Sequence, residues 1–303
     1  MPERETPLSR KQRRKLSKRE QIQRSREGAA IKRARLRRQR IRNRILLISG
    51  VAAATALIAV AGTAAVNANA REAAAGPENM ASDGILFTGD GTTASVVSTA
   101  RLEAGESPHP TAIDETDGIP ALTLYVDFAD KDSATLISTI SDTLTQWLDA
   151  GYLSFEIHPV AMIDTAPADD YSIRSANLIA CMAQYQPDGV LDVVTALASA
   201  RLEDAYQPLT DDELVMLVRN AGYVDDDLES CITSVRFRQW VEKATSRVTE
   251  GGVPLSDVGT LESTPLLLGD RTAYTGEVDD ADAFSSFVVE VYESEAGTTD
   301  DAE

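Results

Sequence analysis

The stretch LTLYVDFADKDSATLISTI, residues 122–140, decides the fold predicted for this chain. Apolar and polar residues alternate from Leu122 to Phe128, which is the period-two pattern of a β-strand. A short polar turn, residues 130–133, follows the strand. Apolar residues then recur at the spacing of an amphipathic helix: Leu136, Ile137, Ile140, Leu144, Trp147 and Leu148. The stretch therefore predicts a strand, a polar turn and a helix in immediate succession.

The charge of the chain is divided between two unlike parts. Residues 1–44 hold 18 of the 29 Lys and Arg residues and 4 of the 48 Asp and Glu residues, a net charge of +14. Residues 45–303 hold the remaining 11 basic and 44 acidic residues, a net charge of −33. Such an asymmetry indicates that the two parts meet different surroundings. Nucleic-acid binding is not expected of the basic part, because no aromatic residue precedes residue 87.

An uncharged apolar run, residues 45–66, separates the two parts. As a helix it is about 33 Å long, which is enough to cross a hydrocarbon core of about 30 Å. Arginines precede the run, so the positive-inside rule places residues 1–44 in the cytoplasm and the acidic part outside it. We predict a retained single-pass anchor in the cell membrane. Cleavage after Ala70 is the alternative, although a signal peptide usually has an apolar run of only about 7–15 residues.

The chain beyond the anchor divides into three parts. Residues 67–118 are rich in small, polar and acidic residues, which predicts an extracytoplasmic linker with a short strand at 84–88. Residues 119–293 are predicted to form one domain, and the acidic residues 294–303 a disordered tail. The basic segment 1–44 is expected to be disordered or helical.

The predicted domain has the order β-α-β, helical insertion, β-β-α. The second strand covers residues 153–161, and the helical block runs from Tyr171 to Gly251. Thr210 and Glu213 form a capping box inside this block. Turn-forming residues predict breaks in the helical block at 186–189, 207–208 and 221–222. After the block, strands are predicted at Leu266–Leu268 and near Tyr274 and Val278, with a turn at Gly276. A closing helix is predicted from the spacing of Phe284, Phe287, Val288 and Val291.

This order resembles the DsbA-like branch of the thioredoxin superfamily, in its membrane-anchored, actinobacterial type. Four segments carry the resemblance: LYVDFADKDS (124–133), FEIHPVAMID (155–164), AGYVDDDLESCI (221–232) and STPLLLGD (263–270). In the family, the first segment leads into a C-x-x-C motif and the last contains a cis-proline that faces it. The resemblance implies an α/β, thioredoxin-like fold with a helical insertion and, for family enzymes, thiol–disulfide exchange.

The sequence departs from the family at the residues that perform the chemistry. Asp130 and Ser133 stand where the motif has its two cysteines, with Lys131 and Asp132 between them. Family enzymes use a low-pKa thiolate at the helix N-terminus, and neither a carboxylate nor a hydroxyl group exchanges disulfides. A carboxylate does suit a helix cap. We therefore expect no catalytic residue here, and Asp130 or Asp132 as the cap.

Two further pairs of residues follow from the resemblance. Thr264 and Pro265 occupy the cis-proline loop, which implies a surface for extended peptide; a trans proline at the start of a strand is the alternative. Cys181 and Cys231 both fall in the helical block. An even pair in an extracytoplasmic domain predicts a structural disulfide, which the resemblance also implies. Free buried thiols and a redox-active pair are the alternatives.

No other motif indicates chemistry. Of the two histidines, His109 lies in the linker, and His158 is expected to be a packed or surface residue rather than a base. Asp225, Asp226 and Asp227 lack the glycine and the spacing of a calcium loop and are expected to cap a helix. We find no zinc, phosphate-loop or dinucleotide pattern, and so predict no metal and no cofactor.

These observations leave three hypotheses for function. We favour a redox-inactive extracytoplasmic module that binds a peptide or an envelope protein through residues 130–133 and 264–265. The first alternative is an oxidoreductase or isomerase-like envelope protein that uses Cys181 and Cys231. The second is a structural spacer, in which the basic leader is the element that binds partners.

Overall fold

The computed structural model describes residues 75–112, 118–163 and 170–298. The basic segment 1–44, the proposed span 45–66 and residues 299–303 lie outside the described residues, so what was expected of them stays a prediction. Within the described ranges, no helix combines the length and the apolarity needed to cross a membrane. All described residues fall in one unit of the chain.

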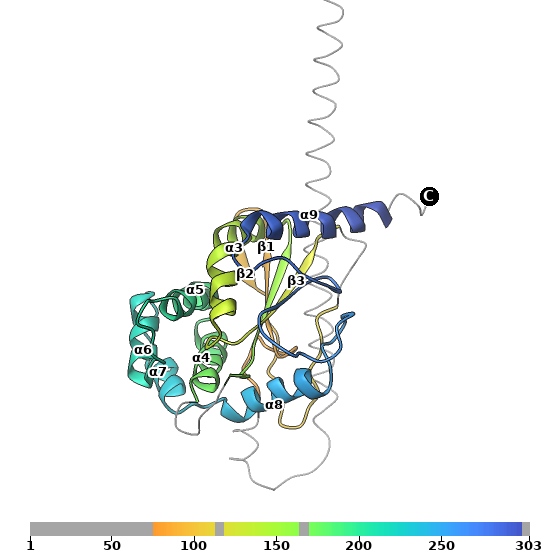
Figure 1. The fold of residues 1–303 in the computed structure, drawn as a ribbon. Coiled ribbons are helices and arrows are strands. Elements are labelled where there is room, and N and C mark those ends of the chain that lie inside the picture. Colours follow the sequence, from red (N-terminus) through yellow and green to blue (C-terminus); the bar gives the residue numbers. More distant parts are fainter. Residues whose placement is uncertain (1–74, 113–117, 164–169, 299–303) are drawn as a thin grey trace, which may run out of the picture. The chain divides into compact units, whose positions relative to one another are not determined.

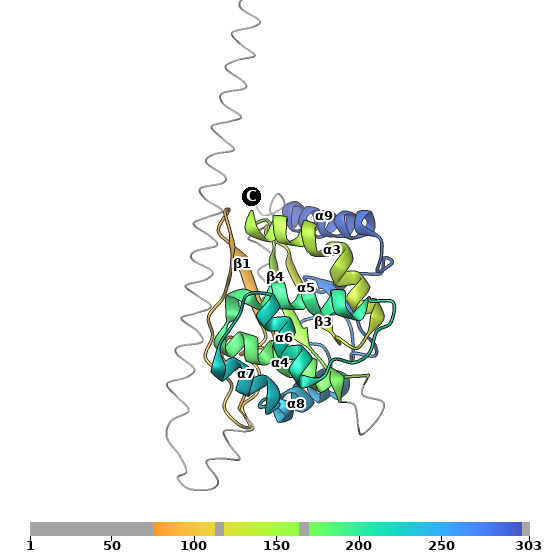
Figure 2. The same cartoon turned by 90° about the vertical axis from the view of Figure 1, so that its left-hand side faces the viewer.

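Six strands form a mixed sheet at the centre of the domain (Figures 1 and 2): β1 (Ile85–Gly89), β2 (Ala94–Val96), β3 (Ala121–Val126), β4 (Ser154–Pro159), β5 (Leu266–Gly269) and β6 (Thr272–Ala273). Their order across the sheet is β2-β1-β4-β3-β5-β6. β3 and β4 are parallel, and every other neighbouring pair is antiparallel. Parallel neighbours need a crossover connection, and helix α3 (Lys131–Asp149) supplies it.

The stretch 122–140 folds as a strand and a helix, but the turn between them lies earlier than predicted, at residues 127–130 and not 130–133. β3 ends at Val126 and α3 begins at Lys131, so residues 131–133 belong to the first helical turn. The cause is local, because the side chain of Asp130 accepts the backbone N–H groups of Asp132 and Ser133 and caps the helix. Of the two candidates for the cap, Asp130 is therefore the one used.

A block of helices follows β4, as predicted (Figure 1): α4 (Tyr171–Tyr185), the 3-10 turn η1 (Pro187–Gly189), α5 (Val190–Arg201), α6 (Asp211–Asn220), α7 (Asp226–Thr233) and α8 (Arg238–Glu250). The breaks before α5, α6 and α7 fall at the three predicted interruptions. Thr210 and Glu213 form the predicted capping box of α6, and Asp225 caps α7. Pro, Gly and capping side chains thus set the boundaries of the insertion.

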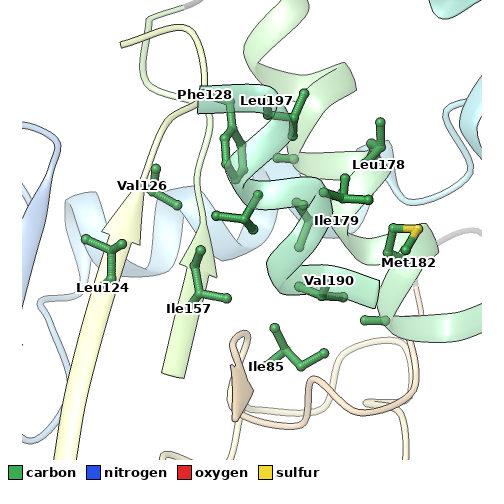
Figure 3. Packing of buried hydrophobic residues seen from close by; sticks show 14 of the residues in the cluster. Ile85, Leu124, Val126, Phe128, Ile157, Leu178, Ile179, Met182, Val190 and Leu197 are labelled. Atoms are coloured by element: carbon green, nitrogen blue, oxygen red, sulfur yellow. The ribbon is translucent and has the colours of Figure 1, made fainter. Parts of the chain in front are cut away.

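Both faces of the sheet are covered. On the first face, Leu124, Val126 and Ile157 point toward the helices of the insertion and pack in one cluster with Ile179 and Leu197 (Figure 3). The opposite face carries a smaller cluster that includes residues of β3, β5 and α8: Tyr125, Val160, Val248, Val253, Leu261 and Leu268. Successive side chains of β3 point to opposite faces of the sheet, and β3 therefore buries side chains on both faces.

The last strands differ from the prediction in their position. β6 covers Thr272–Ala273 and its hairpin turns at Asp270, so neither Tyr274 nor Val278 lies in a strand and Gly276 is not the turn. The Tyr274 ring packs instead on Phe287, with ring centroids 5.3 Å apart. The closing helix α9 (Ala281–Thr298) also extends past residue 293, where the domain was expected to end.

Residues 75–112 form a strap on the domain and correct the predicted linker 67–118. The predicted short strand exists as β1, which pairs with β4, and β2 adds a further strand at the edge. The strap also buries its large apolar side chains, among them Met80, Val97 and Leu102. The composition of the segment is that of a linker, but these few side chains are enough to hold it on the sheet.

Cys181 in α4 and Cys231 in α7 form the predicted disulfide, with their Cα atoms 5.9 Å apart. The bond joins two helices of the insertion. The parallel β-α-β unit, the helical insertion, the antiparallel hairpin and the closing helix together confirm the predicted α/β, thioredoxin-like class with a helical insertion.

Candidate functional site

The two predicted site segments lie side by side at one end of the sheet. β3 and β5 are antiparallel neighbours and Tyr125 pairs with Leu266, so the residues after β3 lie opposite those before β5. The Thr264–Pro265 peptide bond is cis, as expected. The Thr264 hydroxyl donates a hydrogen bond of 2.9 Å to Oδ2 of Asp130, a residue 134 positions away in the sequence. The fold therefore unites the two segments in one site.

Asp130 is the centre of this site. Its Oδ1 accepts the N–H of Asp132 at 3.1 Å, and its Oδ2 accepts the N–H of Ser133 at 3.3 Å and the Ser133 hydroxyl at 2.9 Å. A carboxylate is favoured here because the first N–H groups of a helix lack partners and the helix dipole attracts negative charge. These donors and Thr264 are all neutral, so none of them cancels the charge of the carboxylate.

One side of the site is open to solvent. Lys131 and Asp132 are exposed, Asp130 and Thr264 are half-buried, and Ser133 is fully buried. In the part of the chain that the structure describes, no backbone hydrogen bond uses the N–H or the carbonyl of Thr264. Such backbone groups can pair with an extended chain in the manner of an added strand.

Asp127 supports the site from inside the domain, although no sequence motif singled it out. Its buried carboxylate accepts the backbone N–H groups of Ala129 at 2.9 Å, Met162 at 2.7 Å and Ile163 at 2.9 Å. Burial raises the pKa of Asp127 above its ordinary value, although these hydrogen bonds and the Ser172 hydroxyl act to lower it. Asp127 thereby ties the loop after β4 to the loop before α3. It also fixes the backbone of Ile163, an apolar residue that is 38% exposed.

Arg201, the last residue of α5, fixes the same loop from the helical insertion. Its Nε donates to the carbonyl of Ala129 at 2.7 Å, across 72 positions of sequence. Its guanidinium carbon lies 4.3 Å from the centre of the Tyr206 ring, a cation–π contact. Sequence spacing offered no signal for this contact. A basic residue in the last turn of a predicted helix was the only hint.

No cysteine lies in this site. The two cysteines of the chain are bonded to each other in the insertion, and their residues are 0% and 3% exposed. The side-chain groups that meet at Asp130 are a carboxylate and two hydroxyl groups, and such groups cannot exchange disulfides. Among residues 75–112, 118–163 and 170–298, no group of His, Cys, Asp and Glu side chains is arranged to hold a metal ion.

A second polar cluster fastens the strap to the domain, and no sequence signal indicated it. This strap cluster consists of Ser82, Asp83, Thr111, Glu156, His158, Trp240 and Arg247. Asp83 accepts two hydrogen bonds of 2.6 Å from the Arg247 guanidinium and one of 3.1 Å from Nε1 of Trp240. The carboxylate of Asp83 thus joins the strap to α8.

Glu156 and His158 form the other half of the strap cluster. Glu156 accepts hydrogen bonds from the hydroxyl groups of Ser82 and Thr111, and its Oε2 lies 3.6 Å from Nε2 of His158. Burial acts to raise the pKa of Glu156, but the charge of His158 and the hydrogen bonds prevail and lower it. His158 is 6% exposed and stacks on Tyr125 with ring centroids 4.5 Å apart, so of the two positions expected for it, packed and surface, it takes the packed one.

Comparisons with known proteins find structural neighbours only. No protein-family model and no curated protein matches the sequence. Among solved structures, the chain is similar to the disulfide bond oxidoreductase DsbG of Mycobacterium tuberculosis, with 22% identity and a TM-score of 0.46 over 59% of this chain and 84% of that one. It is also similar to the reduced DsbA of Mycobacterium tuberculosis, with 18% identity and a TM-score of 0.46 over 69% and 99% of the two chains. For MdbA, a thiol-disulfide oxidoreductase from Corynebacterium matruchotii, the identity is 12% and the TM-score 0.48, over 64% and 88%.

Proposed function

We propose that this chain is a membrane-anchored, extracytoplasmic binding module with a thioredoxin-like fold and without thiol–disulfide exchange at the usual site. It binds an extended segment of a peptide or an envelope protein through residues 130–133 and 264–265, and residues 45–66 anchor it. The observation that carries the proposal is the hydrogen bond from Thr264 to Asp130. It joins the helix N-terminus to the cis-proline loop around a carboxylate instead of a thiol.

The surroundings of Thr264 support binding of an extended segment. Its backbone N–H and carbonyl have no backbone partner among the described residues. Lys131 and Asp132 are exposed beside it, and Ile163 offers a partly exposed apolar side chain. Backbone pairing with side-chain contacts on either side is the usual way in which strand addition obtains both affinity and specificity.

The position of the sulfur atoms supports the loss of exchange. Exchange needs a thiolate that can reach a disulfide of the substrate, and Asp130 and Ser133 supply none. The Cys181–Cys231 bond is the remaining candidate for redox chemistry. Its burial in the insertion argues against this second function, because an attacking thiolate would have no access to either sulfur.

A redox assay tests the absence of exchange. We would mix the purified chain with a reduced dithiol peptide in a glutathione buffer and follow oxidation of the peptide, expecting the rate of the buffer alone. The matched control is the double variant Asp130→Cys/Ser133→Cys, which places two thiols at the N-terminus of α3, where thiol pKa values are lowered. The variant is expected to oxidise the peptide. A rate for the native chain above that of the buffer would overturn the proposal, and loss of that activity in Cys181→Ser would assign it to the insertion.

Photocrosslinking in cells tests the binding surface. A photoreactive amino acid would replace Asp132 in the full chain, and the control would carry it in place of Met216, which is 57% exposed on α6. Adducts that form from position 132 and not from position 216 are expected. Equal adduct patterns from both positions would favour the spacer, and deletion of residues 1–40 would then show whether the basic leader binds the partner.

A further inference from the structure

The strap begins at the same end of the sheet as the candidate site. β3 and β4 are parallel, so both end on the side where Asp130 lies. β1 is antiparallel to β4 and pairs Ile85 with Ile157, so the residues before β1 are at that end too. A strand spacing of about 4.8 Å puts β1 roughly 10 Å from β3 across the sheet.

Contacts with α8 confirm this placement. Trp240 donates to Asp83, and its indole ring packs closely on Gly76, where a Cβ would lie 3.1 Å from the ring. One turn further along α8, the Thr245 hydroxyl accepts the N–H of Ala161 at 3.0 Å, in the loop that Asp127 also holds. A single helix thus contacts both the start of the strap and the loop beside the site.

The chain between the proposed anchor and the domain is short. Ala75 is already buried, at 2% exposure, so only residues 67–74, called the leash below, separate the proposed anchor from the domain, and not the predicted linker 67–118. At 3.3–3.6 Å for each residue, the distance from Val66 to Ala75 is at most about 32 Å, whereas the full linker could have reached about 180 Å. A domain of this size has a radius of gyration of about 17 Å. The leash is therefore no longer than the domain is wide.

We propose that the partner is an integral membrane protein, which presents an extended extracytoplasmic segment close to the bilayer to the site around Asp130 and Thr264. This inference rests on the proposed function and on the anchor at residues 45–66. The leash ends on the edge of the domain that carries the site, so it keeps the site near the membrane surface. A soluble secreted partner would gain nothing from this arrangement, because it could reach a site on a long linker equally well.

Lengthening the leash tests the proposal in the full chain. We would insert 30 flexible Gly and Ser residues between Ala70 and Arg71 and measure the photocrosslink from position 132 to the identified partner. The control carries the same 30 residues after Glu303. If the partner is held in the same bilayer, the effective concentration falls with about the −3/2 power of linker length, and the adduct yield is expected to drop roughly fivefold to tenfold. The control is expected to keep the native yield, and retention of the Cys181–Cys231 bond on a non-reducing gel reports that both variants fold.

The nature of the partner is the second readout. Without illumination, the tagged partner is expected to stay in the membrane pellet after alkaline extraction, together with this chain. An adduct yield that does not change with leash length, a partner that alkali releases, or a chain that alkali releases would each overturn the inference while leaving the binding site in place. Absence of any adduct specific to position 132, at both leash lengths, would overturn the proposed function as well.

Discussion

Two carboxylates, Asp130 and Asp83, lie at the same end of the sheet, and they are held by opposite kinds of partner. Asp130 is half-buried and accepts hydrogen bonds from backbone N–H groups and hydroxyl groups, all of them neutral. Asp83 is 5% exposed and is paired with the cation of Arg247. The buried carboxylate of Asp83 is balanced by a cation, whereas the carboxylate of Asp130, at a helix N-terminus with access to solvent, is stabilised by neutral donors.

The difference gives the two carboxylates different roles: Asp83 attaches the strap to the domain, and Asp130 belongs to the proposed binding site. Asp83 and Arg247 pair with each other and fix residues 75–112 to the domain. Among the described residues, the Asp130 carboxylate accepts hydrogen bonds from neutral groups and lies beside exposed Lys131 and Asp132. We therefore expect substitutions in the strap cluster to change stability strongly, and substitutions at the site to change stability little and binding strongly.

The largest effect on stability is expected from Arg247→Ala. It leaves the buried carboxylate of Asp83 without its counter-charge, and the guanidinium is only 31% exposed, so we expect the free energy of unfolding to fall by about 2–4 kcal/mol. Urea denaturation measures the loss. The matched control is Arg219→Ala, because Arg219 also makes two 2.6 Å hydrogen bonds to one carboxylate, Glu229, but is exposed to solvent. Equal losses in both variants would show that burial does not distinguish the two ion pairs.

Acid is expected to weaken the attachment of the strap through Glu156. Its pKa is lower in the folded chain than in the unfolded chain, so its contribution to stability is present above the unfolded pKa of about 4.5 and is lost as the pH falls below it. The free energy of unfolding, measured by denaturation at several pH values, should therefore decrease below about pH 4.5. In Ser82→Ala/Thr111→Val the carboxylate lacks two donors that lower its folded pKa, so the gap to the unfolded pKa narrows and the decrease below about pH 4.5 should be smaller. An identical acid profile in this variant would contradict the role of the two hydroxyl groups.

A smaller effect is expected from Asp130→Ala. Loss of an N-cap side chain costs about 1 kcal/mol, and Asp130→Asn should recover most of it because an amide oxygen also caps. Combined with Thr264→Val in a double-mutant cycle, the hydrogen bond between them should appear as a coupling of about 0.5–1.5 kcal/mol. The adduct yield from position 132 should fall strongly in Asp130→Ala, although the free energy of unfolding changes little. Full adduct yield in Asp130→Ala would place the binding surface elsewhere.

The smallest effect on stability is expected from Lys131→Glu. A cation in the first turn of a helix opposes the dipole, so the change should raise the free energy of unfolding by about 0.3–1 kcal/mol. Because Lys131 is exposed beside the site, the same change should alter the adduct yield from position 132. Gln in place of Glu is the control, since it removes the cation without adding an anion. A yield unchanged in both variants would exclude Lys131 from the contact surface.

The sequence alone determined the elements whose signals are local. The alternation in 122–128 and the helical spacing after it predicted β3 and α3, because burial of one face imposes those periods on neighbouring residues. Pro, Gly and capping side chains marked the breaks of the insertion, because each acts on the backbone within a few positions. Thr210 and Glu213, three positions apart, were enough to predict the start of α6. The absence of cysteine from the site is likewise a property of the sequence, since residues 130–133 are Asp, Lys, Asp and Ser and residues 264–265 are Thr and Pro.

The tertiary structure alone decided what depends on distant partners. The composition of residues 67–118 predicted a linker, but burial of Met80 and the pairing of Asp83 with Arg247, 164 positions away, make most of it part of the domain. The contacts of Thr264 with Asp130 and of Arg201 with Ala129 likewise join segments that no periodicity connects. Local patterns record which face of an element is buried, but not which side chain from elsewhere covers it. For this chain, that covering determines where the domain begins and what surrounds the site.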